Sequence, residues 1–227
     1  PAYGTRSVPR VDKIFGPGNR YVTAAKRLVS ADCAVDMLAG PTEVLIVAQS
    51  GNARYIASDL VAQAEHDPDA VAILVTTSRK LAADVRDCVS EQLSALPPTN
   101  PARRALSDNG AVLIAPSIAA ALQFANLYAP EHLSLPDASP AMLRQLSAAG
   151  SVFLGPWSAQ SAGDYASGTN HVLPTSGGAR SRGGLSTWDF MRCTSVQRIT
   201  RAGLRSLAPV VSALAQAEGL VAHSRAV

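Results

Sequence analysis

The sequence predicts an α/β protein with a parallel sheet at its core, and two observations carry this prediction. Short apolar runs alternate along the chain with longer segments whose apolar residues recur at helical spacing. The runs Val44 to Ala48 and Val71 to Thr76 contain no charged residue, as is typical of strands buried on both faces of a parallel sheet. Because ligands bind beyond the carboxyl ends of such strands, we expect the turns GPGN, AGPT and SAGDY to lie there.

The elements follow from these local patterns in chain order. A short strand at 11–15 runs into the tight turn GPGN, and a helix follows at 20–30. Backbone amides at such a helix start suit a phosphate or a dinucleotide, although GPGN is much shorter than the G-x-G-x-x-G fingerprint. The turn AGPT then leads into the strand at 44–48. The same patterns predict helices at 53–65, 79–96, 118–128 and 140–149, and strands at 71–76, 112–115, 133–135 and 151–154. The segment 97–101, rich in proline, is expected to be a linker.

The pattern changes after Gly184, where strands give way to helical segments. The longest of these, at 202–218, carries one apolar stripe formed by Leu204, Leu207, Val211, Leu214 and Ala215. A helical tail of this length must pack on another body, and we expect that body to be a partner subunit. We therefore divide the chain into an α/β core at 1–185 and a helical tail at 186–227.

Composition excludes several classes of function. The chain has 227 residues, of which 47% are hydrophobic and 16% charged, as in an ordinary soluble globular protein. The formal charge is +3, but the arginines between Arg180 and Arg205 alternate with Gly, Ser and Thr, which disfavours a nucleic-acid surface. Three widely spaced cysteines without a C-x-x-C pair fit a reducing cytoplasm. No apolar run has transmembrane length, so no membrane is expected.

Ser161 to Thr175 is the stretch around which the chain is organised. It shows no helical or alternating apolar period, so we expect an ordered loop that serves a site. Asp164 and His171 in this loop are candidates to face a metal or a substrate. The alternative is that Asp164 caps a turn and His171 binds backbone.

The four histidines of the chain lie beside or near carboxylates. These side chains are candidates for a zinc site of nitrogen and oxygen ligands and for a proton acceptor. They are His66, His132, His171 and His223, with Glu65, Glu131, Asp164 and Glu218. Gln63 and His66 are three residues apart, so they share one face of the predicted helix, while Glu65 points away. His66 capping that helix is the alternative. Glu131 and His132 are adjacent in an extended segment, so we expect their side chains to diverge and take different partners.

Several segments together resemble the carboxyl-terminal half of histidinol dehydrogenase. They are VDKIFGPGN, AGPTEVLIVA, SDLVAQAEHDPDA, APEHLSL, SVFLGPWSAQSAGDYASGTNHVLPT and EGLVAHSRAV, and they cover essentially the whole chain. The resemblance implies an incomplete Rossmann-like core of the aldehyde-dehydrogenase-like type. It also implies oxidation of L-histidinol through L-histidinal to L-histidine with NAD and zinc, in a homodimer.

The resemblance also implies roles for particular residues. Glu131 and His132 match the catalytic pair, and Asn19 matches a residue near NAD. The zinc ligands would be Gln63, His66, Asp164 and, from the other subunit, His223. The substrate-binding positions would be Thr42, Gln63, His66, Glu131, Asp164, His171, Glu218 and His223, with Thr42 standing where the family often has serine.

The sequence departs from the family pattern in three places. The amino-terminal half is absent, Leu38 stands where proline is common, and the segment before it is a few residues short. Three other functions stay open: a related dehydrogenase acting on another polar alcohol, a zinc hydrolase, and an inactive fragment that retains only the zinc and dimerisation elements. The carboxylate of Glu218 favours a substrate with an ammonium or imidazole group over one with a sulfonate.

Overall fold

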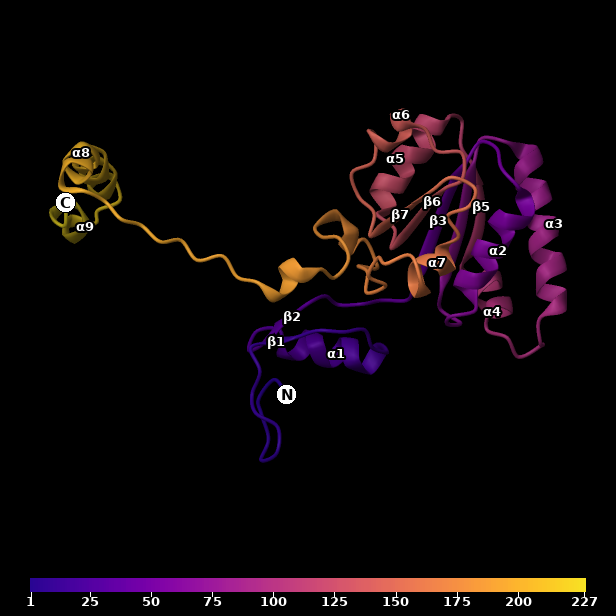
Figure 1. The fold of residues 1–227 in the computed structure, drawn as a ribbon, viewed down its shortest axis with the longest axis horizontal. Coiled ribbons are helices and arrows are strands. Elements are labelled where there is room, and N and C mark those ends of the chain that lie inside the picture. Colours follow the sequence, from indigo (N-terminus) through magenta and orange to yellow (C-terminus); the bar gives the residue numbers. More distant parts are fainter. The chain divides into compact units, whose positions relative to one another are not determined.

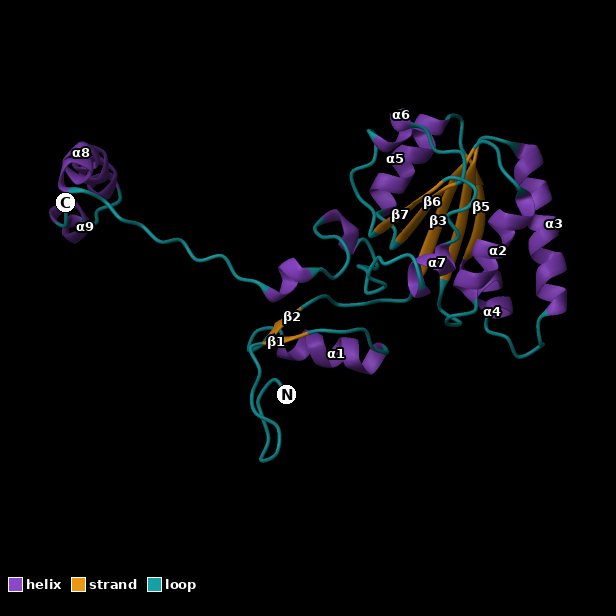
Figure 2. Cartoon of the chain, viewed as in Figure 1, coloured by secondary structure: helices purple, strands orange, loops and turns teal.

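Five parallel strands form the centre of the fold (Figures 1 and 2). The structure, a computed structural model, describes residues 1–227, which divide into two compact units, Pro1–Asp189 and Phe190–Val227. The sheet lies in the first unit and has the strand order β5-β4-β3-β6-β7. Its strands are β3 (Glu43–Ala48), β4 (Val71–Thr76), β5 (Gly110–Ile114), β6 (His132–Leu135) and β7 (Ser151–Leu154). The predicted α/β class with a parallel-sheet core is confirmed.

Helices cover both faces of this sheet (Figure 2). One face carries α2 (Ala53–Ala64), α3 (Arg79–Ala95) and α4 (Ala102–Asn109), and the other carries α5 (Ile118–Tyr128) and α6 (Pro140–Leu143). Successive side chains of β3 point to opposite faces of the sheet, as the pleat of a strand requires. Val44 and Ile46 pack against α2 and α3, whereas Leu45 and Val47 pack against α5. All four are fully buried, which explains why β3 is apolar along its length after Glu43.

The helices that accompany the sheet differ from the prediction in three places. The first third of the predicted loop at 161–175 instead belongs to the helix α7 (Gln160–Tyr165). Glycine disfavours helices, yet this helix contains Gly163. Only glycine fits there, because a Cβ at this position would lie 2.6 Å from the Phe153 ring. The helix α4 was not predicted and follows the linker directly. The predicted helix at 140–149 ends at Leu143. Leu146 and Ala149, in the irregular chain beyond it, pack against the same core cluster as Met142 of the helix.

The amino-terminal segment of the first unit forms a small βαβ motif. Its parallel strands β1 (Lys13–Ile14) and β2 (Ala34–Val35) flank α1 (Arg20–Val29). The strand predicted at 11–15 is therefore only two residues long, and β2 was not predicted. Two short 3₁₀ helices follow the sheet, at Gly178–Arg180 and Thr187–Phe190.

The second unit consists mainly of α8 (Arg201–Ala217) and α9 (Val221–Arg225). Thr200 caps α8 by accepting a hydrogen bond from the backbone N–H of Gly203, and Gly219 follows with a φ of 74°. The residues after Gly219 form the short helix α9. No helix of the chain combines the length and the apolar character needed to cross a membrane.

Asp59 on α2 makes the stability of the first unit depend on pH. Burial raises its pKa to about 6, against a slight lowering by the backbone N–H of Gln160 (3.4 Å). An Asp in the unfolded chain has a pKa of about 3.9, so the folded state binds the proton more tightly. The free energy of unfolding therefore decreases as the pH rises from about 4 to about 6.

We expect Asp59→Asn, which keeps the hydrogen-bond acceptor but carries no charge, to raise the free energy of unfolding near pH 7. The expected gain is about 1–2 kcal/mol, roughly half of the full linkage value because the side chain is partly exposed to solvent. The gain should vanish near pH 4. Urea unfolding of parent and variant at both pH values measures the difference. An equal gain at both would show that the effect does not come from the charge.

Candidate active site

Glu131 and His132 lie at the start of β6 and are almost completely buried, with exposed fractions of 6% and 3%. The Glu131 Oε2 atom accepts hydrogen bonds from the Thr42 hydroxyl (2.6 Å) and the Glu43 backbone N–H (2.9 Å). The His132 Nδ1 atom lies 3.1 Å from the Glu43 backbone carbonyl oxygen. A carbonyl oxygen only accepts, so Nδ1 carries a proton, and a neutral ring then presents a lone pair at Nε2.

The Nε2 atom of His132 is buried and has no hydrogen-bond partner in the chain. It lies 3.7 Å from Asp164 Oδ1, within reach of its charge but too far for a hydrogen bond. Burial alone would lower the pKa of His132, but the nearby carboxylates of Asp164 and Glu131 outweigh it and raise the pKa above 6.5. Burial also raises the pKa of Glu131. The pair therefore combines a buried proton acceptor that has no partner in the chain with a carboxyl group that is easily protonated.

The two side chains do not diverge as predicted. The His132 Nδ1 atom is 3.5 Å from Glu131 Oε2, and both side chains turn toward Glu43. The alternation of side chains in a strand does not separate them, because Glu131 precedes the first residue of β6.

The site also lies at the opposite edge of the sheet from the one expected. Thr42 directly precedes β3, and His132 opens β6, so both lie at the amino ends of their strands. In the sheet register, Val44 pairs with His132, which brings these strand starts together. Asp164 follows β7 in sequence, but α7 returns to His132. The predicted placement at the carboxyl ends is therefore wrong for AGPT and SAGDY.

A chain of hydrogen bonds links Gln63 to the buried pair. Gln63 is fully buried, and its amide nitrogen donates to the Thr42 hydroxyl (2.5 Å), which in turn donates to Glu131. Its carbonyl oxygen Oε1 accepts a hydrogen bond from the side-chain amide of Gln160 on α7. Thr42 thus fixes the orientation of the Gln63 amide, with its oxygen on the side of α7.

Three of the four predicted zinc ligands come from adjoining elements of the first unit. His66 and Asp164 line one cavity together with Gln160, and Gln63 lies beside them through its bond to Gln160. Within the chain, no three His, Cys, Asp or Glu side chains are placed to hold a metal ion. Imidazole and carboxylate are common zinc donors and an amide oxygen is an uncommon one, and Gln160 Oε1 is buried here without a partner. The donor set fits zinc if one further ligand is supplied.

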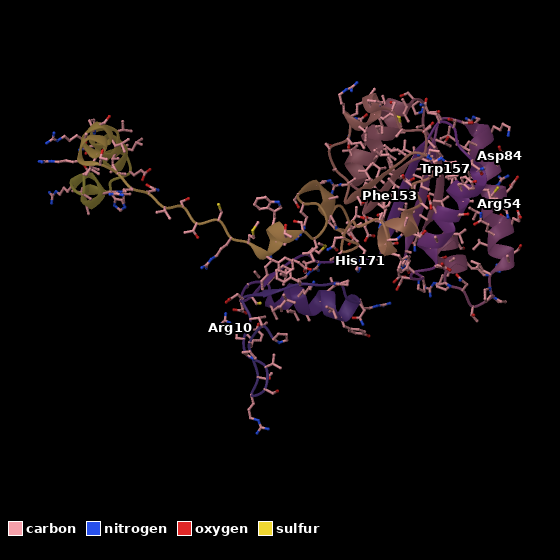
Figure 3. The ribbon with its side chains drawn as sticks, viewed as in Figure 1. Arg10, Arg54, Asp84, Phe153, Trp157 and His171 are labelled. Carbon is pink, nitrogen blue, oxygen red and sulfur yellow. The ribbon has the colours of Figure 1, made fainter.

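Asp164 is the electrostatic centre of this cavity. Its proximity to His132 lowers its pKa, and the nearby imidazoles of His66 and His171 lower it further. His171 is exposed on the loop after α7 (Figure 3). The carboxylate thus stays ionised at neutral pH, as a metal ligand must.

Asn19 caps α1, since its side-chain oxygen accepts hydrogen bonds from the backbone N–H groups of Tyr21 and Val22. Asn19 also lines a cleft of about 640 Å³ that extends to Thr42 and His66. The turn GPGN and the buried site are therefore joined by one open space in the first unit.

Glu218 and His223 belong to the second unit. Glu218 directly follows α8 at its C-cap, and His223 is exposed on α9. Their roles in the site stay predictions.

Sequence reasoning missed Glu43. Its backbone N–H donates a hydrogen bond to Glu131, and its backbone carbonyl accepts one from His132. Its side chain accepts hydrogen bonds from Tyr128 Oη (2.9 Å) and the Ser176 N–H (3.0 Å). Burial raises the pKa of Glu43. A single carboxylate at the head of an otherwise apolar strand was the signal that could have found it. Gln160 was also missed, and nothing in its sequence context marks it.

The family model of histidinol dehydrogenase matches residues 1–227, the whole of the chain. The chain belongs to the histidinol dehydrogenase family. It is 51% identical over its full length to histidinol dehydrogenase of Vibrio vulnificus (strain YJ016), and 50% identical over 98% of its length to that of Methanothermobacter thermautotrophicus. It covers 53% of each of these relatives.

A solved structure agrees with this assignment. The crystal structure of histidinol dehydrogenase from Elizabethkingia anophelis matches with a TM-score of 0.93 and 42% identity, covering 99% of this chain and 52% of that one. The chain thus spans about half the length of the histidinol dehydrogenases it matches.

Proposed function

We propose that the protein containing this chain oxidises L-histidinol through L-histidinal to L-histidine, with NAD as acceptor and with zinc, in histidine biosynthesis. We propose further that it is a cytoplasmic homodimer. Family membership supports this proposal. The observation that carries it is the unpaired Nε2 atom of His132, buried beside Glu131 and Asp164.

His132 is the base of the proposed reaction. In each oxidation a hydroxyl proton passes to Nε2 of His132, and NAD, when bound, would accept the hydride. The Glu43 carbonyl, which holds Nδ1, keeps the ring oriented with Nε2 toward the substrate. Hydrogen bonds from Thr42 and Glu43 orient Glu131, which activates the water that converts the aldehyde to its hydrate before the second oxidation.

Gln63, His66 and Asp164 would hold zinc from one subunit, with His223 from the partner. When bound, the zinc would supply a positive charge that holds the imidazole and amine of the substrate. Thr42 and His171 would contact the substrate, and the Glu218 carboxylate would suit its cationic groups. The hydrogen bond from Gln63 to Thr42 uses the amide nitrogen, so the oxygen is the atom that would bind the metal.

The direct test is the stoichiometry of the full-length protein with zinc, NAD and L-histidinol. We expect two molecules of NADH per molecule of histidinol consumed, with histidine as the product. Absorbance of NADH and chromatography of the products measure both. A protein that forms no NADH with histidinol, or stops at one NADH and releases the aldehyde, would contradict the proposal.

A further inference from the structure

The helix α1 is attached to the chain mainly by polar contacts. Lys26 is its one buried residue, whereas Tyr21 and Leu28 are about four-fifths exposed, at 77% and 80%. The hydroxyl of Thr23, three residues before Lys26, donates to the backbone carbonyl of Ala39 (2.8 Å). Residues three apart lie on the same face, so this polar face holds the helix in place.

Lys26 forms a buried ion pair with Asp36. Its Nζ atom lies 2.5 Å from Asp36 Oδ1, and the side chains are 6% and 0% exposed. Burial would raise the pKa of Asp36, but hydrogen bonds from Lys26, Gly16 and Met37 more than offset it, so the pKa lies below its ordinary value and the carboxyl is ionised. Both charges are therefore present in the folded protein.

The pair holds both backbone groups of Gly16, the first residue of the GPGN turn. The N–H of Gly16 donates to Asp36 Oδ2 (2.7 Å), and its carbonyl accepts a hydrogen bond from Lys26. Gly16 has a φ of 116°, in the region that favours glycine, so the turn needs such external support to keep one conformation.

Asp36 also fixes the start of the opposite wall of the cleft. Its Oδ1 accepts a hydrogen bond from the N–H of Met37 (2.6 Å), and its backbone carbonyl accepts one from Arg182. The chain continues from Met37 to Thr42, which lines the cleft together with Asn19. One ion pair thus sets the position of the turn that bears Asn19 relative to the segment that bears Thr42.

A buried ion pair contributes little net stability compared with two apolar side chains of similar volume, because both charges lose their hydration. The geometry that it fixes is therefore its main effect. We propose that Lys26 and Asp36 are positioning residues that hold the Gly16–Asn19 turn for binding of NAD. This proposal rests on the proposed function, in which Asn19 contacts NAD.

The test compares two variants of the full-length protein. Lys26→Met leaves Asp36 buried without a partner, so it should lower the melting temperature. Lys26→Met combined with Asp36→Leu removes both charges and should recover part of that loss, because the backbone N–H groups of Gly16 and Met37 still lose their acceptor. In both variants we expect the KM for NAD to rise about 10-fold or more, since the turn loses its anchors. The kcat, the KM for histidinol and the zinc content should stay within about 2-fold of the parent, because Thr42 keeps its hydrogen bonds with Gln63 and Glu131.

Lys80→Met is the matched control, because it removes a lysine from an ion pair with Asp84 that is exposed to solvent. It should change none of these quantities. A purely structural role would instead restore the KM for NAD in the double variant together with its melting temperature, and that result would overturn the proposal. NADH binding is also measured directly by fluorescence. The effect of the ion pair on dinucleotide binding can then be tested even if histidinol proves not to be the substrate.

Discussion

Replacing His132 by asparagine in the full-length protein should lower turnover about 10²-fold or more while the zinc content stays normal. Asparagine offers no proton acceptor at the position of Nε2, the buried atom that has no partner within the chain. His132 is not among the proposed zinc ligands, so the metal should still bind. The loss should appear in kcat rather than in the KM for histidinol. Steady-state kinetics and metal analysis of the same preparation measure both quantities.

Glu131→Gln is the matched variant, because glutamine keeps an oxygen that can accept from Thr42 and Glu43 but carries no charge. Oxidation of histidinal should suffer more than oxidation of histidinol, since only the aldehyde step consumes water. If His132→Asn turns over at the parental rate, the base lies elsewhere and the proposed mechanism fails.

The parts of the fold that sequence predicts well are those whose local pattern has one solution. The predicted bounds of β4, α5 and β7 are those of the structure, because apolar residues without interruption or at helical spacing fill each element. Local pattern fails where distant contacts decide. The helix α7 forms around Gly163 because Phe153 packs against it, and β1 and β2 are too short to show any period.

The residues of the candidate site could be predicted from the sequence, but their arrangement around the sheet could not. The pair at 131–132 and Asp164 stand out by residue type and by resemblance to the family. The pair lies at the amino edge of the sheet because it stands at the start of β6, whereas Asp164 reaches that edge because α7 returns to His132, which no sequence pattern reveals. Glu43 escaped for a related reason. Its main contributions to the pair are made by its backbone groups, and these are the same in every residue type except proline.

The last prediction concerns the fourth zinc ligand. The helix α8 leaves Leu204, Leu207 and Leu214 exposed, an apolar stripe that a partner surface would bury. His223 lies just beyond it on α9, also exposed. We propose that the tail docks across a two-fold dimer, so that each zinc takes Gln63, His66 and Asp164 from one chain and His223 from the other.

In that arrangement His66→Ala and His223→Ala should each be inactive as homodimers and should complement when the full-length variant chains are assembled together. A mixed dimer places both lesions in one site and leaves the other site with every ligand. Random mixing makes about half of the dimers mixed, so roughly a quarter of the parental sites should be restored, which NADH formation and zinc content measure. If His223 instead bound zinc within its own chain, every site in every dimer would carry one lesion. Mixed dimers confirmed by differential tagging would then form no NADH from histidinol, and the shared site would be refuted.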